Sequence, residues 1–198
     1  MTQDRSDIQF AVKELCRKMS NPDQGDWMKL KRLGRYLKSC PESIIKYDYQ
    51  GAMDGIVAWT DSDFAGCKAT RKSTGGGVMM LGNHLIKSWS LTQSVIALSS
   101  GEAEFYSLVK GASNALGLQA MIKDLGIYLT LQINTDATAA VGMVRRSGFG
   151  RVRHNDVSQL WIQDMVSKGK IKITKVRTED NLSDTLTKHV KSEILKIT

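Results

Sequence analysis

A long amphipathic helix in the middle of the chain constrains the fold more than any other feature. From residue 99 to about residue 125, apolar side chains recur every three or four positions, which is the period of a helix. Ser99 and Glu102 form a capping-box pattern at its start, and Gly126 follows as a stop signal. The apolar run at 94–98 predicts a strand just before it. The sequence therefore predicts a strand-to-helix junction at the centre of the chain.

Two glutamates in the first turns of this helix have different expected roles. Glu102 stands three residues after Ser99, so its carboxylate satisfies a backbone donor at the helix start. Glu104, two positions later, lies about 200° further round the helix and does no capping. Glu104 therefore needs another explanation, and we expect it to be one corner of a four-carboxylate metal site.

Two aspartates come directly after predicted strands. The buried run 56–60 leads into Asp61, and the run 129–135 leads into Asp136. Taken singly, each aspartate is explained better as a helix cap or a turn residue than as a ligand. Taken together with Glu104 and Asp184 they point to one site, because strand ends meet the following loops and helices at one edge of an α/β sheet.

The remaining elements complete an α/β domain with a mixed sheet. Gly82-Asn83 predicts a tight hairpin turn, so the first strands of the sheet are antiparallel. Residues 171–176 alternate as a last strand, and Asn181 caps a final helix that holds Asp184. Further helices are expected at residues 137–145 and around residues 157–166.

The first part of the chain has a different pattern. Residues 1–48 hold two predicted helices, interrupted at Asn21-Pro22 and ended at Cys40-Pro41. A segment this short buries too little surface to fold alone, so we interpret it as a lid on, or a fragment of, something larger. Residues 44–49 predict a short strand, and the main domain is expected to span residues 49–198.

Composition narrows the class of protein. The chain has 198 residues, enough for one domain of about 140 residues with a smaller piece attached. Its three cysteines are an odd number at wide spacing, which argues against disulfides and for a reducing compartment. With no apolar run of about 18 residues and no signal peptide, we expect an intracellular protein of the cytoplasm or nucleus that has no membrane partner.

The positive charge is strong and clustered. The formal net charge of +8 favours a polyanionic partner. Three groups of basic residues stand apart in the sequence: Lys29, Lys31, Arg32, Arg35 and Lys38; Lys68, Arg71 and Lys72; and Arg145, Arg146, Arg151 and Arg153. Such groups are typical of a track for phosphates, and the second and third are the expected nucleic-acid-binding residues of the main domain.

Four neighbouring carboxylates need cations. Unless positive charge neutralises them they repel one another, and their pKa values rise. Mg²⁺ prefers oxygen ligands and completes its shell with water and substrate phosphate, whereas a zinc site would need a Cys/His cluster that this sequence lacks. Two such ions about 4 Å apart support phosphodiester cleavage. The residues therefore predict a magnesium-dependent nuclease site.

Four motifs follow one another along the main domain. They are WTDSDFAG at 59–66, RKSTGG at 71–76, ALSSGEAEF at 97–105 and TEDNLSDTLTK at 178–188. In this order they resemble the ribonuclease H domain of copia-type retrotransposon polyproteins, over roughly residues 52–190. The run WMKLKRLGRYLK at 27–38 resembles the end of the reverse transcriptase region of the same polyproteins. The aspartate-pair motif of reverse transcriptases is missing, so we expect a carboxy-terminal fragment that does not polymerise DNA.

The resemblance implies a type 1 ribonuclease H fold, with a mixed five-stranded sheet and flanking helices. The implied activity is hydrolysis of the RNA strand of RNA–DNA hybrids with two Mg²⁺ ions, or Mn²⁺ in their place. Asp61 would bridge both ions, Glu104 and Asp136 would complete the ligands of one, and Asp184 would hold the ion that carries the attacking water. Glu102 is the alternative to Glu104, because helix starts are uncertain by a residue or two. The implied partners are the hybrid, recognised through ribose 2′-hydroxyls, and the upstream reverse transcriptase region.

One departure from cellular ribonucleases H concerns a histidine. Those enzymes often place a mobile histidine before the last aspartate, where it assists product release, but residues 177–180 contain none. His154 is a remote substitute and is better explained as a surface residue. Copia-type domains also tend to lack this histidine. Its absence therefore bears on the rate of the expected reaction and not on the type of reaction.

Two other functions stay open. The first is a decayed, non-enzymatic module that still binds hybrids. The second is a DNA transposase or integrase of related fold, but those enzymes order their acids as Asp, Asp and then Glu. In this chain Glu104 lies between Asp61 and Asp136, which favours ribonuclease H.

Overall fold

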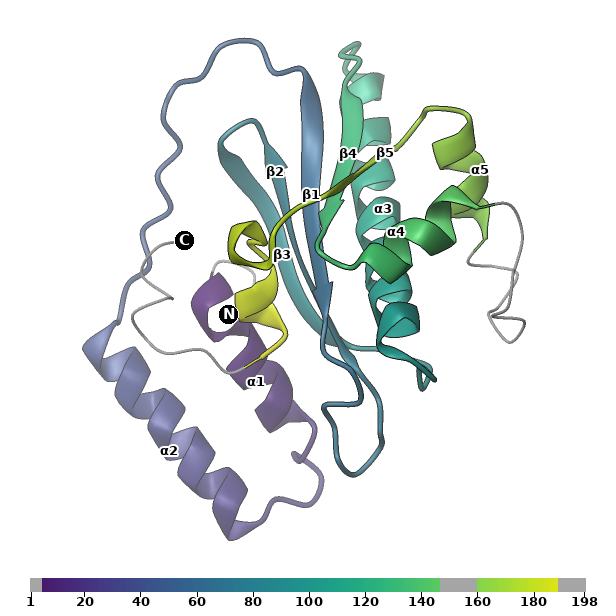
Figure 1. Ribbon diagram of the computed structural model, residues 1–198. Helices are drawn as coiled ribbons and strands as arrows, with labels where there is room; N and C mark the ends of the chain where they lie inside the picture. The colour runs from purple at the N-terminus through teal and green to yellow at the C-terminus, as the bar shows by residue number, and fades with distance from the viewer. Residues whose placement is uncertain (1–4, 147–159, 189–198) are drawn as a thin grey trace.

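The described part of the chain is built on one five-stranded sheet (Figure 1). The computed structural model describes residues 5–146 and 160–188. The strands are β1 (Gly55–Ser62), β2 (Thr74–Leu81), β3 (His84–Thr92), β4 (Thr130–Thr135) and β5 (Lys172–Lys175), in the spatial order β3-β2-β1-β4-β5. The first three strands pair antiparallel, whereas β4 runs parallel to β1 and to β5. The predicted mixed sheet is confirmed, and Gly82 and Asn83 form the expected turn between β2 and β3.

Helices cover the two faces of this sheet. One face carries α3 (Ser100–Asp124), α4 (Thr138–Arg145) and α5 (Trp161–Ser167). The other face carries α1 (Gln9–Cys16) against β3 and the 3-10 helix η4 (Asp184–Leu186) against β1 and β2. Outside α1 lies α2 (Gln24–Ser39), and two 3-10 helices, η1 (Ser6–Ile8) and η3 (Thr178–Asp180), complete the described elements.

The main core lies between the sheet and α3. Ile56 and Ala58 of β1 are fully buried and alternate with half-buried residues, as expected for a strand with one face on a helix layer. Phe105, Leu108 and Ala112 recur at helical spacing on α3 and are at most 1% exposed. The predicted long helix is confirmed, and Ser99 is its N-cap.

Three consecutive glycines let both faces of β2 be approached closely. On the α3 face, a Cβ on Gly77 would overlap the ring of Trp89. On the other face, a Cβ on Gly76 would lie 2.8 Å from Thr187 Cγ2 and 2.9 Å from Leu186 Cβ. These neighbours leave no room for a side chain, so Gly76 is needed to bring η4 against the sheet and Gly77 is needed to make space for Trp89.

Two predicted strands are wrong. Residues 44–49 form no regular structure, and Ile44 and Tyr49 are 87% and 99% exposed. Residues 94–98 leave the sheet after Gln93 and turn into the start of α3. In both places the apolar pattern favours a strand, but no neighbouring strand offers the backbone partners that a ladder requires.

The final helix is shorter than predicted. In its place stands the single 3-10 turn η4. The helix expected around residues 157–166 is present as α5 from Trp161, and Val157 lies outside the described residues. Within residues 5–146 and 160–188, no helix combines the length and apolar character needed to cross a membrane.

Candidate metal centre

Asp61 is the acidic residue that the sheet itself positions. It is the next-to-last residue of β1, pairs with Gly76 of β2 and is 7% exposed. Thr187 Oγ1 donates a hydrogen bond to Asp61 Oδ2 from the face that carries η4. Ser107 Oγ on α3 donates to the Asp61 carbonyl oxygen at 2.6 Å from the opposite face. Asp61 is therefore fixed from both sides of the sheet.

The first turns of α3 bring Glu104 to the same end of β1. The Ser62 backbone N–H donates to Glu104 Oε1 at 3.1 Å. Gln93 Nε2 ties the helix to the strand, because it donates to Ala103 O at 2.8 Å and to Ser62 Oγ at 3.1 Å. Glu104 Oε2 is buried and has no hydrogen-bond partner among the described residues. A buried acceptor without a partner is costly, and a bound cation would satisfy it.

Glu102 has the capping role expected from the sequence. Its backbone N–H donates to Ser99 Oγ at 3.2 Å, and its carboxylate accepts from Leu98 N–H and Tyr106 Oη at 2.8 Å each. In an ideal capping box the Glu102 carboxylate would accept from the backbone N–H of the N-cap residue, Ser99. Here it accepts from the N–H of Leu98, one residue earlier. Because both carboxylate oxygens have donors and the residue is 1% exposed, the geometry favours Glu104 over Glu102 as a ligand.

Asp136 completes a group of three carboxylates. It directly follows β4, whose parallel pairing with β1 places the ends of the two strands side by side. One carboxylate oxygen each from Asp61, Glu104 and Asp136 lies within 4.8 Å of the other two. Three of the four predicted ligands, from a strand, a helix and a loop, therefore come together.

Asp184 lies outside this group of three. It opens η4, and its Oδ1 is 2.6 Å from Lys188 Nζ. Its negative charge nevertheless raises the pKa values of Asp61 and Glu104, so it acts on the same site electrostatically. Lys188 offsets part of that charge.

Burial and mutual repulsion raise the pKa values of two carboxyl groups. Burial, followed by the negative charges of Asp61 and Asp136, raises the pKa of Glu104 to about 9. Burial also raises the pKa of Asp61, to which Asp184 and Asp136 contribute, while the Thr187 hydrogen bond opposes the shift. Carboxyl groups whose pKa values are raised by burial and by neighbouring negative charge suit a hard divalent cation such as Mg²⁺.

The segment that carries Asp184 is fixed to the sheet by bonds that sequence reasoning missed. Asn181 Nδ2 donates to Thr60 O at 3.1 Å, and Ser90 Oγ donates to Leu186 O at 2.6 Å. Asn181 was expected to cap a helix, and its Oδ1 does accept from Ser183 N–H at 3.3 Å. The only sequence signal for Thr187 is its place in the motif at 178–188.

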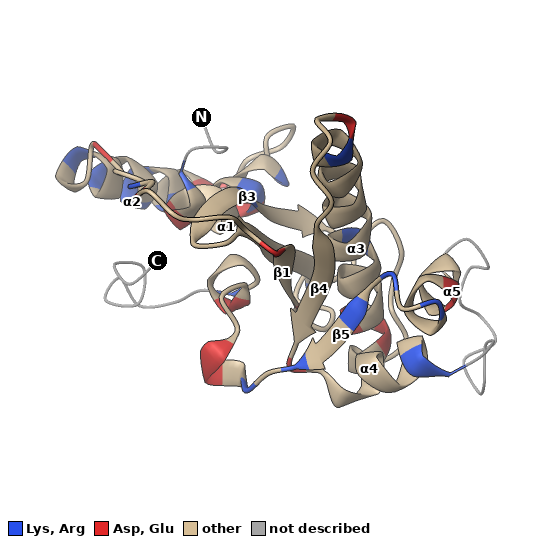
Figure 2. Cartoon of the chain, turned by 90° about the horizontal axis from the view of Figure 1, so that it is seen from above, with Lys and Arg blue, Asp and Glu red and all other residues tan. Residues whose placement is uncertain are grey.

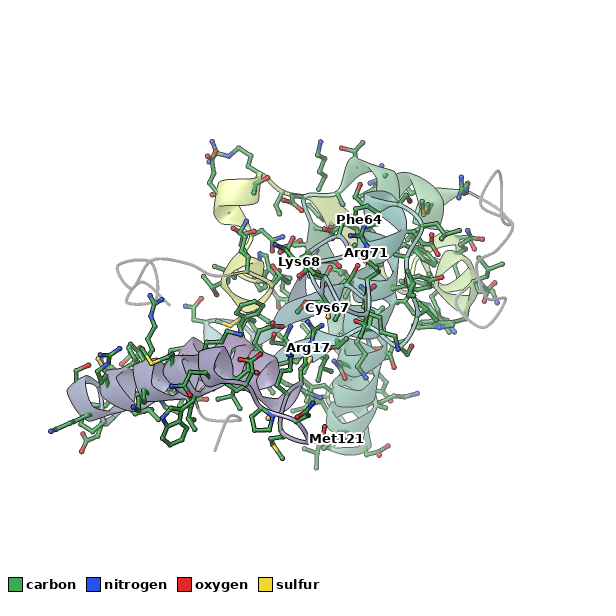
Figure 3. All side chains as sticks on the ribbon, turned by 90° about the horizontal axis from the view of Figure 1, so that it is seen from below. Arg17, Phe64, Cys67, Lys68, Arg71 and Met121 are labelled. Carbon is green, nitrogen blue, oxygen red and sulfur yellow. The ribbon has the colours of Figure 1, made fainter. Side chains whose placement is uncertain are left out.

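The predicted nucleic-acid-binding residues lie in different surroundings. Lys68 and Arg71 are exposed in the loop 63–73 that follows β1, and Figure 3 shows them near Phe64. Lys72, in the same loop, is half-buried. At the end of α4, Arg145 is exposed and donates to Ile173 O at 3.2 Å, and Arg146 is half-buried. Arg151 and Arg153 lie outside the described residues.

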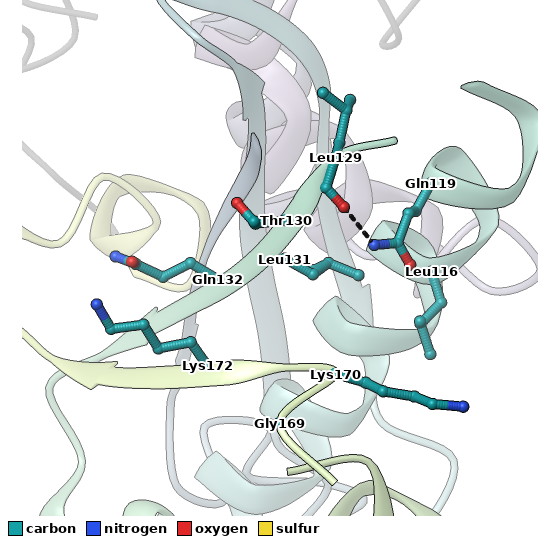
Figure 4. Close-up of a pocket in the computed structure, with 9 residues that line it drawn as sticks. All are labelled: Leu116, Gln119, Leu129, Thr130, Leu131, Gln132, Gly169, Lys170 and Lys172. Carbon is teal, nitrogen blue, oxygen red and sulfur yellow. Dashed lines mark hydrogen bonds between the residues drawn. The ribbon is translucent and has the colours of Figure 1, made fainter. Parts of the chain in front are cut away.

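A separate pocket lies at the opposite end of the sheet (Figure 4). It has a volume of 630 Å³ and is formed where β4 and β5 begin, with Leu116, Leu131, Lys170 and Lys172 among its walls. Figure 4 shows Lys170 and Lys172 pointing in different directions. No carboxylate lines this pocket, so it offers none of the acidic ligands found at Asp61.

The strand order and the position of the acidic residues together define a class. Three antiparallel strands, a long helix and two further parallel strands, with carboxylates gathered where β1 and β4 end, make a ribonuclease H-like domain. This is the fold class that the motifs implied.

Comparison with known proteins identifies the family. No protein-family model matches the chain. The chain is 33% identical over 187 residues to the retrovirus-related Pol polyprotein from transposon RE1 of Arabidopsis thaliana, covering 93% of this chain and 13% of that polyprotein. It is 30% identical over 189 residues to the corresponding polyprotein from transposon TNT 1-94 of Nicotiana tabacum, covering 94% and 14%. The chain therefore belongs to the retrovirus-related Pol polyproteins of copia-type transposons.

The match is to one segment of these long proteins. The chain spans about a seventh of the length of the two curated relatives. Among solved structures, it is similar to the N-terminal ribonuclease H domain of a Mycobacterium tuberculosis protein, with a TM-score of 0.47 and 18% identity over 69% of this chain and 91% of that one. The family assignment rests on the sequence relatives.

Proposed function

We propose that this domain hydrolyses the RNA strand of RNA–DNA hybrids during reverse transcription of a retrotransposon, by a mechanism that uses two divalent metal ions. The observation that carries the proposal is the meeting of Asp61, Glu104 and Asp136 within 4.8 Å in a ribonuclease H-like fold. Membership of the Pol polyprotein family supports it.

The four carboxylates would share the ligand roles. Asp61 would contact both ions, Glu104 and Asp136 would complete the shell of one, and Asp184 would bind the other. Bound Mg²⁺ ions supply an activated water and stabilise the leaving oxygen. Two hydrogen bonds would hold these ligands in advance, because Thr187 donates to one oxygen of Asp61 and Ser62 N–H donates to one oxygen of Glu104, while Glu104 Oε2 has no hydrogen-bond partner among the described residues.

Basic side chains would hold the hybrid against this site. The loop with Lys68, Arg71 and Lys72 follows β1 directly in the chain, and Lys68 and Arg71 are exposed to solvent on it. Contacts with phosphates fix a duplex in register and orientation without reading its sequence. The group formed by Arg145, Arg146, Arg151 and Arg153 stays a proposal for the same role, and the upstream polymerase region stays the proposed partner within the polyprotein.

The direct test is cleavage of a labelled RNA–DNA hybrid in Mg²⁺, beside RNA and DNA duplexes of the same sequence. We expect only the hybrid to be cut and EDTA to stop the reaction. Asp136→Asn should abolish cutting, because it removes one carboxylate from the group of three. Asp164→Asn is the matched control, since Asp164 is exposed on α5 and pairs only with Lys168 among the described residues.

Each other outcome has a definite meaning. Cutting of the DNA duplex would favour the transposase or integrase reading. A folded protein that binds the hybrid without cutting it would be a non-enzymatic remnant of the element. Equal activity of Asp136→Asn and the unaltered protein would show that cleavage does not depend on this group of carboxylates.

A further inference from the structure

The solvent face of α2 carries a stripe of three basic residues and one tryptophan. Trp27, Lys31, Arg35 and Lys38 follow one another at spacings of four, four and three residues, so they share one side of the helix. All four are exposed, and Lys31 Nζ lies 5.4 Å from the centroid of the Trp27 ring. Figure 2 shows basic residues distributed along α2. We call these four residues the α2 stripe.

The positive charge of the α2 stripe is not neutralised. Asp26 is the one acidic residue of α2, but it is buried, it caps the helix start and it pairs with Lys29 at 2.9 Å. Within residues 5–146 and 160–188, Lys31, Arg35 and Lys38 have no ion pair with a carboxylate. Three full positive charges therefore face solvent on one side of the helix.

The body of the protein holds α2 in place. At its carboxy-terminal end, Tyr36 Oη donates to Asp7 Oδ2 at 2.9 Å, and Arg5 pairs with the same oxygen at 2.8 Å. The next helix inwards, α1, is bonded to the sheet, since Lys13 Nζ donates to Thr74 Oγ1 at 2.6 Å. The stripe is thus an ordered surface connected to the sheet through α1.

The helix α2 lies on the same side of the molecule as the loop 63–73, which carries Lys68 and Arg71. In Figure 3, Lys68 and Arg71 lie near the middle of the view, and Arg17 lies between them and α2. Figure 1 agrees, because one end of α1 lies between α2 and the loop that joins β1 to β2. A duplex held at the loop and extended past α1 would therefore meet α2 next.

We propose that the α2 stripe binds the phosphate backbone of the RNA–DNA hybrid, outside the part of the duplex held at Asp61. This rests on the proposed function for the identity of the ligand. Lys31 to Lys38 spans about 10 Å at 1.5 Å per residue. That length covers about three base-pair steps of a duplex at ~3.4 Å each. A polyanion fits three unpaired cations better than a protein surface, which would have to desolvate them.

The test is hybrid binding by fluorescence anisotropy in EDTA, which prevents cleavage, at several salt concentrations. The variant Lys31→Ala/Arg35→Ala/Lys38→Ala is compared on hybrids of about 8 and about 24 base pairs, where only the longer one reaches α2. For the long hybrid we expect affinity to fall about tenfold or more and the salt slope to fall by nearly three, at ~0.9 per phosphate contact. Affinity for the short hybrid should stay unchanged.

The matched control is Lys123→Ala/Lys170→Ala/Lys172→Ala. It removes the same number of exposed charges at the end of the sheet remote from the carboxylates and should leave both affinities near those of the unaltered protein. The charge-preserving variant Lys31→Arg/Arg35→Lys/Lys38→Arg should bind the long hybrid normally. Circular dichroism checks that each variant is folded.

Several results would overturn the proposal. The first is equal binding of the long hybrid by the α2-stripe variant and the unaltered protein. The second is a loss of affinity in the control variant as large as that in the α2-stripe variant. The third is a loss confined to binding of the upstream polymerase segment, which would make α2 a protein-docking surface. Cleavage of the short hybrid in Mg²⁺ tests the nuclease separately. If no variant cuts but the length-dependent binding difference persists, the nuclease proposal fails and the binding surface stands.

Discussion

Thr187 controls Asp61 through a single buried hydrogen bond. The residue is 1% exposed, and its hydroxyl donates to Asp61 Oδ2. Thr187→Val keeps the shape but removes the donor, which costs about 1–3 kcal/mol for a buried acceptor left unpaired. We expect weaker Mg²⁺ binding by calorimetry and a cleavage rate lowered about tenfold. Thr187→Ser restores the hydroxyl and should retain most activity, so equal losses in both variants would contradict a positioning role.

Glu104 makes the stability of the metal-free protein depend on pH. Its pKa is about 9 in the folded protein against an ordinary value of 4.5, so the folded state keeps a proton that the unfolded chain has lost at neutral pH. This stabilisation is fully present below about pH 4.5 and is lost as the pH rises towards 9. In EDTA, the melting temperature should therefore fall between pH 5 and pH 9.

The variant Glu104→Gln isolates this effect. It has no proton to lose, so its melting temperature should change less over the same pH range. Mg²⁺ should raise the melting temperature of the unaltered protein most at high pH, where the carboxylates are charged. Parallel melting curves for Glu104→Gln and the unaltered protein would show that another group causes the pH dependence.

At the scale of elements, the contact between η4 and the sheet places Asp184. A Cβ on Gly76 would lie 2.8 Å from Thr187 Cγ2 and 3.2 Å from the Leu186 carbonyl carbon, so Gly76→Ala should push η4 away. We expect a loss of about 1–3 kcal/mol in the free energy of unfolding, measured in urea, together with lower hybrid cleavage.

Gly117→Ala in α3 is the matched control for this substitution. A Cβ there meets nothing within 4 Å, so it should stabilise the helix by about 0.5–1 kcal/mol and leave cleavage unchanged. Normal cleavage by Gly76→Ala would show that the position of η4 does not matter to the site.

Elements with a local signal can be predicted from the sequence, and elements that depend on distant partners cannot. The strand before Asp61 and the helix with Glu104 show their periods within a few residues, so both were correct. Residues 44–49 and 94–98 have the pattern of strands but lack a pairing partner, which no local pattern reveals. The same limit applies to Thr187, whose role depends on a bond to a residue far away in the sequence.

At the scale of the whole molecule, the helical segment and the sheet are packed together. Ile8 is 2% exposed, and Gln9 Nε2 donates to Ser88 O on β3 at 3.3 Å. The boundary between residues 48 and 49 stays a prediction. Removing residues 1–48 should lower the melting temperature, because it uncovers the face of β3 on which α1 packs.

A pair of point variants makes the same test in the full chain. Ile8→Ala should lower the free energy of unfolding by about 2–4 kcal/mol, because it leaves a cavity under α1. Leu30→Ala, at a side chain 46% exposed on α2, should have little effect. A truncated protein as stable as the full chain, or equal effects of the two point variants, would show that the helical segment is independent of the sheet.

The wide spacing of the four acidic residues along the sequence has a consequence while the protein is being synthesised. Asp61 belongs to the first strand, whereas Asp184 lies beyond the last one and reaches the sheet through Asn181 and Thr187. A ribosome releases these parts in sequence, so a chain that is still being made has Asp61 without the segment that orients it. Under the proposed chemistry, the chain therefore cannot cut a hybrid until the segment that ends at Lys188 has been made and has packed on the sheet.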